Sequence, residues 1–152
     1  MIQYKLIIKP LTTNIMSIEI NIEAQKKFGE AVNTANWDLI KEVVSADSID
    51  HDPGEGQIQG PEGYIAFFKQ FRSAFPDLKV ELVHLVADED NLAFAYELTG
   101  THQGDFQGIA PTNKPIKARG VQISKFKDGK IVERWGSSDV LGILTQIGLQ
   151  LK

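Results

Sequence analysis

Two strand-like runs joined by Asp128-Gly129 limit the fold of this chain more than any other feature of its sequence. A tight turn between strands requires positive φ angles, which aspartate and glycine tolerate, so this pair between alternating runs predicts a β-hairpin. The stretch begins at Val121 and continues past Asp139 into an amphipathic segment that reaches Gly148. We therefore expect two antiparallel strands that end at Asp139, followed by a short C-terminal helix.

The first half of the chain has apolar residues at helical spacing in three segments. The first segment places them from Ala24 to Ala35, and Asn36 can cap a second, shorter helix. The third helix begins with Pro61 at its first helical position and stops at Pro76, because proline cannot continue a helix. Its aromatic stripe consists of Tyr64, Phe67, Phe68, Phe71 and Phe75.

From Asp77 onward the apolar period changes from helical to alternating, which indicates strands. Helices followed by an antiparallel meander predict an α+β fold, with three N-terminal helices packed on a curved, mostly antiparallel sheet. Such a sheet encloses a cone with one open end, where we expect a small-molecule pocket with mainly aromatic walls. Two sets of alternating residues are each expected to share one face of a strand: Leu78, Val80, Leu82, His84 and Val86, then Leu92, Phe94, Tyr96, Leu98 and His102.

Length and composition exclude several classes of protein. At 152 residues the chain has room for one domain. We assign it to residues 17–152 and treat residues 1–16 as a leader, either disordered, non-native or an extra strand. The net charge of −4 without a basic stripe argues against a nucleic-acid partner. No apolar run approaches the roughly 20 residues of a membrane span, so we expect a cytoplasmic protein.

Several short motifs stand out along the chain: HDP at 51–53 before a Gly-rich loop, GPEG at 60–63, RSAFPD at 72–77, GTHQGDFQGIAPTNKPI at 100–116 and DGKIVERWGSSDVLGILTQIG at 128–148. Together they resemble the SnoaL-like polyketide cyclase, or ester cyclase, family of the nuclear transport factor 2-like superfamily. The resemblance extends from Ile20 to Gly148. It implies a cone-shaped α+β fold and an intramolecular aldol condensation that uses no metal and no organic cofactor.

The chain departs from this family at the two positions that carry its acid–base chemistry. The resemblance places the family's catalytic aspartate at Gly136 and its histidine on the preceding strand at Gln122. Glycine cannot move a proton, and glutamine can donate a hydrogen bond but cannot titrate. Asp139 survives three residues further on. Its carboxylate either turns into the cone as a substitute base or caps the C-terminal helix.

The three histidines are the remaining candidates for catalysis, each with a structural alternative. His84 should face the cone or the core, as a pocket base or as a hydrogen-bonded core histidine. His102 either acts in the pocket or braces the loop that follows it. His51 lies at a strand end beside the Gly-rich loop, where the open rim of a pocket is expected. No two histidines have the close spacing of a metal-ligand pair.

Two hypotheses for function remain. In the first, the protein is an enzyme, an aldol cyclase or isomerase that acts on a small apolar carbonyl compound through Asp139 or a histidine. In the second, it is a noncatalytic ligand-binding or interaction module. Homodimers are expected through the outer sheet face, where Val83 and Leu85 lie opposite His84. The residues expected to contact the ligand are Tyr64, Phe68, Phe94, Tyr96, Gln122 and Trp135.

Overall fold

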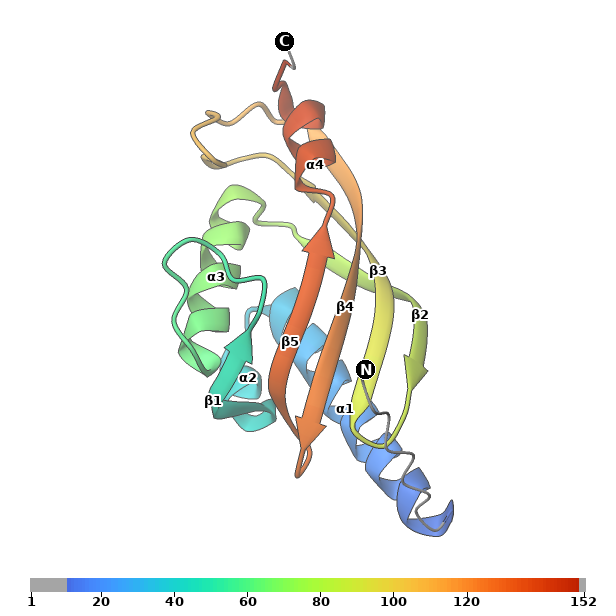
Figure 1. The fold of residues 1–152 in the computed structure, drawn as a ribbon. Helices are drawn as coiled ribbons and strands as arrows, with labels where there is room; N and C mark the ends of the chain where they lie inside the picture. Colours follow the sequence, from blue (N-terminus) through green and yellow to red (C-terminus); the bar gives the residue numbers. More distant parts are fainter. Residues whose placement is uncertain (1–10, 151–152) are drawn as a thin grey trace, which may run out of the picture.

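The computed structural model describes residues 11–150, and their side chains from residue 15 onward. These residues form four helices and a curved sheet of five strands, in the order β1-β5-β4-β3-β2 (Figure 1). β1 runs parallel to β5, and the other neighbours are antiparallel, which confirms the predicted α+β architecture. The elements are α1 (Leu11–Thr34), α2 (Asp38–Val43), β1 (Val44–Asp50), α3 (Pro61–Ala74), β2 (Lys79–Ala87), β3 (Asn91–Thr101), β4 (Pro115–Lys127), β5 (Lys130–Ser138) and α4 (Val140–Ile147).

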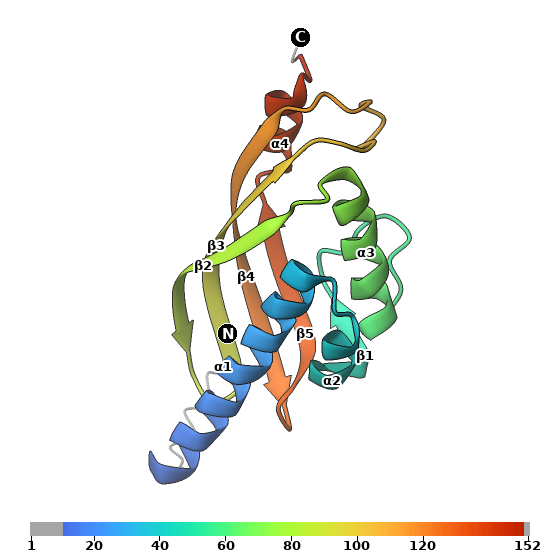
Figure 2. The same ribbon diagram turned by 180° about the vertical axis from the view of Figure 1, so that it is seen from behind.

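The first helix starts earlier than the sequence suggested. Residues 11–16, assigned to the leader above, form the first turns of α1, while residues 1–10 lie outside the described part of the chain. These turns extend beyond the lower end of the sheet in Figures 1 and 2. No helix in the described range is long and apolar enough to cross a membrane.

Helices cover the inner face of the sheet. Figure 2 shows α1 crossing this face diagonally, with α2 and α3 beside it near β1. Strict alternation along β4 buries Ile116, Ala118 and Phe126 beneath these elements, because successive strand residues point to opposite faces. α4 contributes the fully buried Ile143 and Ile147 at the end of β5.

The predicted turn between β4 and β5 is confirmed. Asp128 and Gly129 have φ angles of 53° and 72°, and the flanking Lys127 and Lys130 are paired. Further along this hairpin the register shifts, because Lys125 pairs with Glu133 while Phe126 pairs with Ile131. Val132 is therefore an unpaired extra residue, a β-bulge. Beyond it Arg134, Gly136 and Ser138 lie opposite the inward-facing Ser124, Gln122 and Gly120.

A second bulge corrects the prediction for β2. Leu82 pairs with Tyr96 and His84 with Ala95, so Val83 has no partner. The extra residue reverses the alternation, and the exposed His84 shares the outer face with Val86 rather than facing the core. Leu85, predicted for the outer face, pairs with Phe94 and turns inward.

Candidate ligand-binding site

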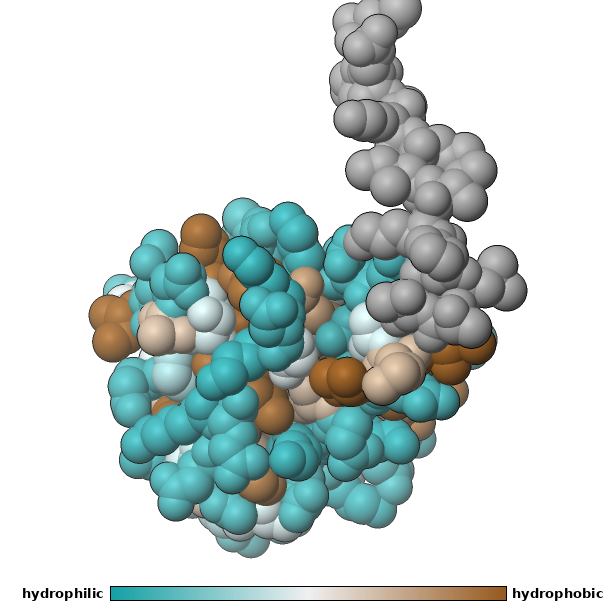
Figure 3. Space-filling model, turned by 90° about the horizontal axis from the view of Figure 1, so that it is seen from below, coloured by the Kyte–Doolittle hydropathy of each residue, from teal (hydrophilic) through white to brown (hydrophobic). Residues whose placement is uncertain are grey.

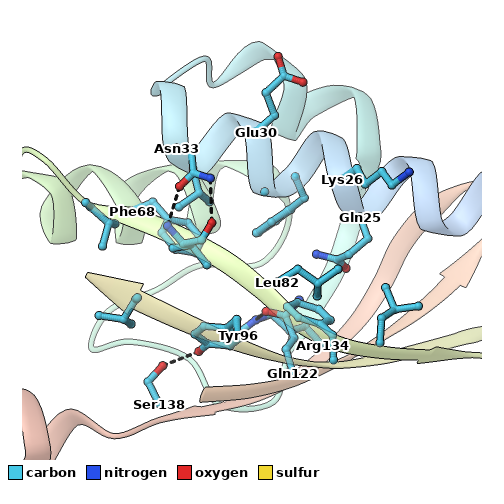
Figure 4. A pocket seen from close by; sticks show the side chains of 18 of the residues that line it. Gln25, Lys26, Glu30, Asn33, Phe68, Leu82, Tyr96, Gln122, Arg134 and Ser138 are labelled. Carbon is cyan, nitrogen blue, oxygen red and sulfur yellow. Dashed lines mark hydrogen bonds between the residues drawn. The ribbon is translucent and has the colours of Figure 1, made fainter. Parts of the chain in front are cut away.

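A cavity of about 510 Å³ lies between α1, α3 and the inner face of the sheet. Apolar side chains from both helices and from the sheet give the cavity a largely hydrocarbon wall, among them Phe28, Phe68, Phe71, Val80, Leu85 and Phe94. Arg134, Gln122, Tyr96 and Ser138 gather at the sheet side of the cavity (Figure 4). An apolar wall with a few converging polar groups is the usual form of a small-molecule site.

Tyr96 is fixed in this polar group by packing and by one hydrogen bond. Its ring lies over Gly120 of the neighbouring strand, where a Cβ atom would collide with the phenol. The phenol oxygen lies 2.6 Å from the Ser138 hydroxyl (Figure 4). Gly120 is therefore required for the orientation of Tyr96.

A chain of hydrogen bonds connects α1 to the far strands beneath the cavity. The Ser124 hydroxyl donates to Gln25 Oε1 at 2.8 Å, and Gln122 Nε2 donates to Ser124 Oγ at 2.9 Å. Arg134 Nε donates to Gln122 Oε1 at 2.9 Å. These groups are buried or half-buried. Removing one of them would leave its partner without a hydrogen bond and would lower the free energy of unfolding.

This chain of hydrogen bonds ends in an ion pair between Arg134 and Asp50, whose side chains are largely buried. Arg134 Nη1 donates to both carboxylate oxygens of Asp50 at 2.9 Å, and Gln57 Nε2 donates to Asp50 Oδ2 at 3.0 Å. The two charged side chains are only 13% and 6% exposed. Breaking such a pair from one side leaves an uncompensated buried charge, which is strongly destabilising. Nearby, burial raises the pKa of the Tyr64 phenol.

Gly136 lies beside this ion pair. A Cβ at Gly136 would collide with Arg134 Nη2. The guanidinium of Arg134 thus fills the space that a side chain at 136 would need. On the other side, the Gly136 N–H donates to the Asp52 carboxylate at 2.9 Å.

Four of the six predicted wall residues line the cavity, and two do not. Phe68, Phe94, Tyr96 and Gln122 are among its lining residues. Tyr64 is buried behind Phe28, in an edge-to-face contact with ring centroids 5.7 Å apart. Trp135 is paired with the exposed Ile123 and stacks on His51 on the outer side of the sheet. Neither ring reaches the cavity.

None of the three histidines lines the cavity. His51 stacks on Trp135 with centroids 4.4 Å apart and lies 2.9 Å from the Glu133 carboxylate. His84 is exposed on the outer face. His102 is fully buried, and its Nδ1 accepts a hydrogen bond from the Thr112 backbone N–H at 3.3 Å. His102 therefore braces the loop between β3 and β4.

Asp139 is the N-cap of α4. Its carboxylate accepts a hydrogen bond from the Gly142 N–H at 2.7 Å. Of the two roles expected for Asp139, substitute base or helix cap, the structure shows the cap. A Cβ at Gly142 would collide with this carboxylate, so the glycine matches the cap. Asp139 is exposed and does not line the cavity. Within residues 11–150 no cluster of three His, Asp or Glu side chains is placed to hold a metal ion.

The sequence analysis missed the buried Gln25 and Ser124 and the half-buried Asp50 and Arg134. One signal for Arg134 was present: it stands two residues from Gly136, and residues two apart on a strand share a face. Its partner Asp50 is 84 residues away. The pair depends on the parallel contact of β1 with β5, for which the sequence has no local signal.

Comparisons with known proteins agree with this fold. The sequence model of the SnoaL-like polyketide cyclase family matches residues 22–147. The aklanonic acid methyl ester cyclase AcmA of Streptomyces galilaeus is 25% identical over 131 residues, covering 84% of this chain and 90% of AcmA.

Two solved structures extend the comparison. IdmH of Streptomyces antibioticus, assigned as a polyketide cyclase, is 27% identical with a TM-score of 0.76, covering 85% of this chain and 99% of IdmH. AclR of Streptomyces galilaeus, assigned as a hydroxylase, is 25% identical with a TM-score of 0.77, covering 89% and 85%. The same cone therefore occurs in proteins assigned to different reactions.

Proposed function

The chain belongs to the SnoaL-like polyketide cyclase family, and from this membership we propose that its cavity binds a small apolar compound carrying a carbonyl group. The observation that carries the proposal is the apolar wall with hydrogen-bonding groups on one side, from Tyr96, Gln122 and Arg134. The wall would hold a hydrocarbon body by the hydrophobic effect. The polar groups would fix the orientation of an oxygen atom.

Binding is better supported than proton transfer. Removal of a proton beside a carbonyl needs a base within hydrogen-bond reach. The lining residues include no histidine and no aspartate, and the one carboxylate among them, Glu30, points away from the cavity on α1 (Figure 4). Gly136 and Gln122 offer no titrating group at the positions of the family's acid and histidine.

A direct titration tests the binding. Naphthyl and anthraquinonyl ketones or methyl esters should shift the NMR signals of cavity residues. Leu82→Trp, at the exposed rim of the cavity, should weaken binding at least about tenfold by filling the entrance. Val83→Trp is the matched control, because the neighbouring bulge residue is exposed and does not line the cavity. Absence of shifts in cavity residues at millimolar ligand would contradict the proposal.

The competing function is cofactor-free aldol cyclase or isomerase activity, favoured by the likeness to AcmA. It requires Asp139 or a histidine to act as the base. Product formation from polyketide methyl esters, followed by mass spectrometry, distinguishes the two. We expect no turnover above background. Turnover that Asp139→Asn abolishes while the protein stays folded would establish the enzyme.

A further inference from the structure

We propose that Arg134 determines which end of the ligand enters the cavity, by donating a hydrogen bond to an uncharged carbonyl oxygen above Gly136. The site would then prefer ketones and esters to hydrocarbons of the same shape, without favouring free carboxylic acids. This inference rests on the proposed function, since it concerns the same cavity.

The hydrogen bonds of Arg134 leave one nitrogen free for a ligand. Nε donates to Gln122, and Nη1 donates to Asp50. Nη2 has no hydrogen-bond partner among residues 11–150. Nη2 is not fully buried, because Nε2 of His102 is the one fully buried side-chain N or O atom without a partner in that range. Arg134 is one of the residues that line the cavity, so Nη2 is the donor of this side chain that remains for a ligand there.

The position of Nη2 reverses the usual polarity of the site. It lies directly over Gly136, where the family's cyclases carry their acid. A carboxylate there would face an acidic C–H group of the substrate. A guanidinium instead presents N–H donors, so the ligand group that meets it must be a hydrogen-bond acceptor.

The charge of the guanidinium is already balanced. Asp50, 6% exposed, accepts both hydrogen bonds from Nη1. A ligand carboxylate would bring a second negative charge to this pair and would lose its hydration on entering an apolar cavity. Lys26 and Glu30, the other two charged residues of the lining, have opposite signs and are both exposed on α1. A neutral carbonyl oxygen needs no such compensation.

Three naphthalene derivatives of similar size test the inference: 2-acetylnaphthalene, 2-ethylnaphthalene and 2-naphthoic acid. In the unmodified protein we expect the ketone to bind about tenfold more tightly than the ethyl compound, as one hydrogen bond from a charged donor allows. The acid should bind no more tightly than the ketone. In Arg134→Gln the preference for the ketone should fall to about twofold or less, with the ethyl compound still bound.

Two controls keep the result interpretable. Arg119→Gln changes an exposed arginine on the outer face of β4 and should leave the preference intact. Because Arg134→Gln leaves Asp50 unpaired, the double variant Asp50→Asn/Arg134→Gln is measured beside it. In the unmodified protein, the Arg134 side-chain N–H signals should shift with the ketone and not with the ethyl compound.

The failures are distinguishable. If none of the three compounds binds, the proposed function is wrong. If both neutral compounds bind but the preference is absent, or persists when Arg134 is replaced, the role of Arg134 is overturned. Tighter binding of the acid than of the ketone would overturn the selection for uncharged ligands.

Discussion

Position 136 cannot be understood apart from the arginine two residues before it. The sequence has glycine where the resemblance places the family's acid, so Gly136→Asp would be the natural change for restoring cyclase activity. The structure changes this expectation, because Arg134 Nη2 fills the space that the new side chain needs. A carboxylate forced in beside a guanidinium would be held ionised and hydrogen-bonded, and would therefore be a weak base.

We therefore expect Gly136→Asp alone to give no measurable aldol turnover and to lower thermal stability, since it displaces a buried ion pair. Gly136→Asp/Arg134→Gln should be the more active variant, by up to the ~10²–10⁴-fold that a general base typically supplies. Product formation from polyketide methyl esters and thermal melts of both variants provide the check. Higher turnover in the single than in the double variant would show that the arginine does not suppress the base.

Asp77 gives a residue-scale prediction about pH. Its carboxylate accepts hydrogen bonds from the Thr101 hydroxyl and backbone N–H, both at 2.7 Å, and these bonds lower the pKa of Asp77 below 3.8. Because the pKa is lower in the folded than in the unfolded protein, the ionised carboxylate stabilises the fold above pH 3.8. This stabilisation is lost as the pH falls through the folded-state pKa.

The stability difference between the unmodified protein and Asp77→Asn should thus be present at neutral pH and shrink as the pH falls below 3.8. Urea unfolding at a series of pH values measures it. Glu55→Gln, in an exposed loop, is the matched control and should show no such trend. A difference that stays constant across the acid range would contradict the assignment.

At the scale of elements, alternation and turn chemistry predict β3, the β4–β5 turn and the helices of the first half, because these depend on local sequence. They fail at two bulges. Extra residues at Val83 and Val132 shift the pairing by one, which moves His84 and Trp135 to the outer face. Strict alternation would have paired Gln122 with Trp135, whereas the bulge pairs it with Gly136. Bulges depend on the partner strand, so one strand's sequence does not reveal them.

The cap of α4 is the element-scale prediction. Asp139→Ala should lower the free energy of unfolding by ~1 kcal/mol, because the Gly142 N–H loses its acceptor, while Asp139→Asn should change it by a few tenths at most. Urea unfolding measures both, with Ser137→Ala on the exposed face as control. Equal losses of stability in the alanine and asparagine variants would contradict a capping role that an asparagine side chain can also fill.

At the scale of the whole molecule, we propose that a homodimer would form through the outer sheet face. Val83, Val86, Val121 and Ile123 are 45–63% exposed. The strand register puts Val86, Ala93 and Ile123 in one row across three strands, so these side chains form a contiguous patch. The lower end of the molecule differs, since Figure 3 shows separate hydrophobic spots among hydrophilic residues there.

Val121→Glu should shift a dimer toward monomer in light scattering at micromolar concentration, because it places a charge within this patch. Leu141→Glu, equally apolar and exposed but on α4, should not change the molar mass. A monomeric unmodified protein would refute the dimer.

The two bulges also bear on how the length of this chain can change during evolution. Deleting one residue from a regular strand turns every later side chain to the opposite face, and such deletions are rarely tolerated. Val83 and Val132 are unpaired. Deleting either residue would therefore leave the side chains on both sides of it on the faces of the sheet that they now occupy. We expect distant relatives to differ by single-residue gaps at these points. Such a gap inside a strand would then mark a preserved cavity lining rather than a misalignment.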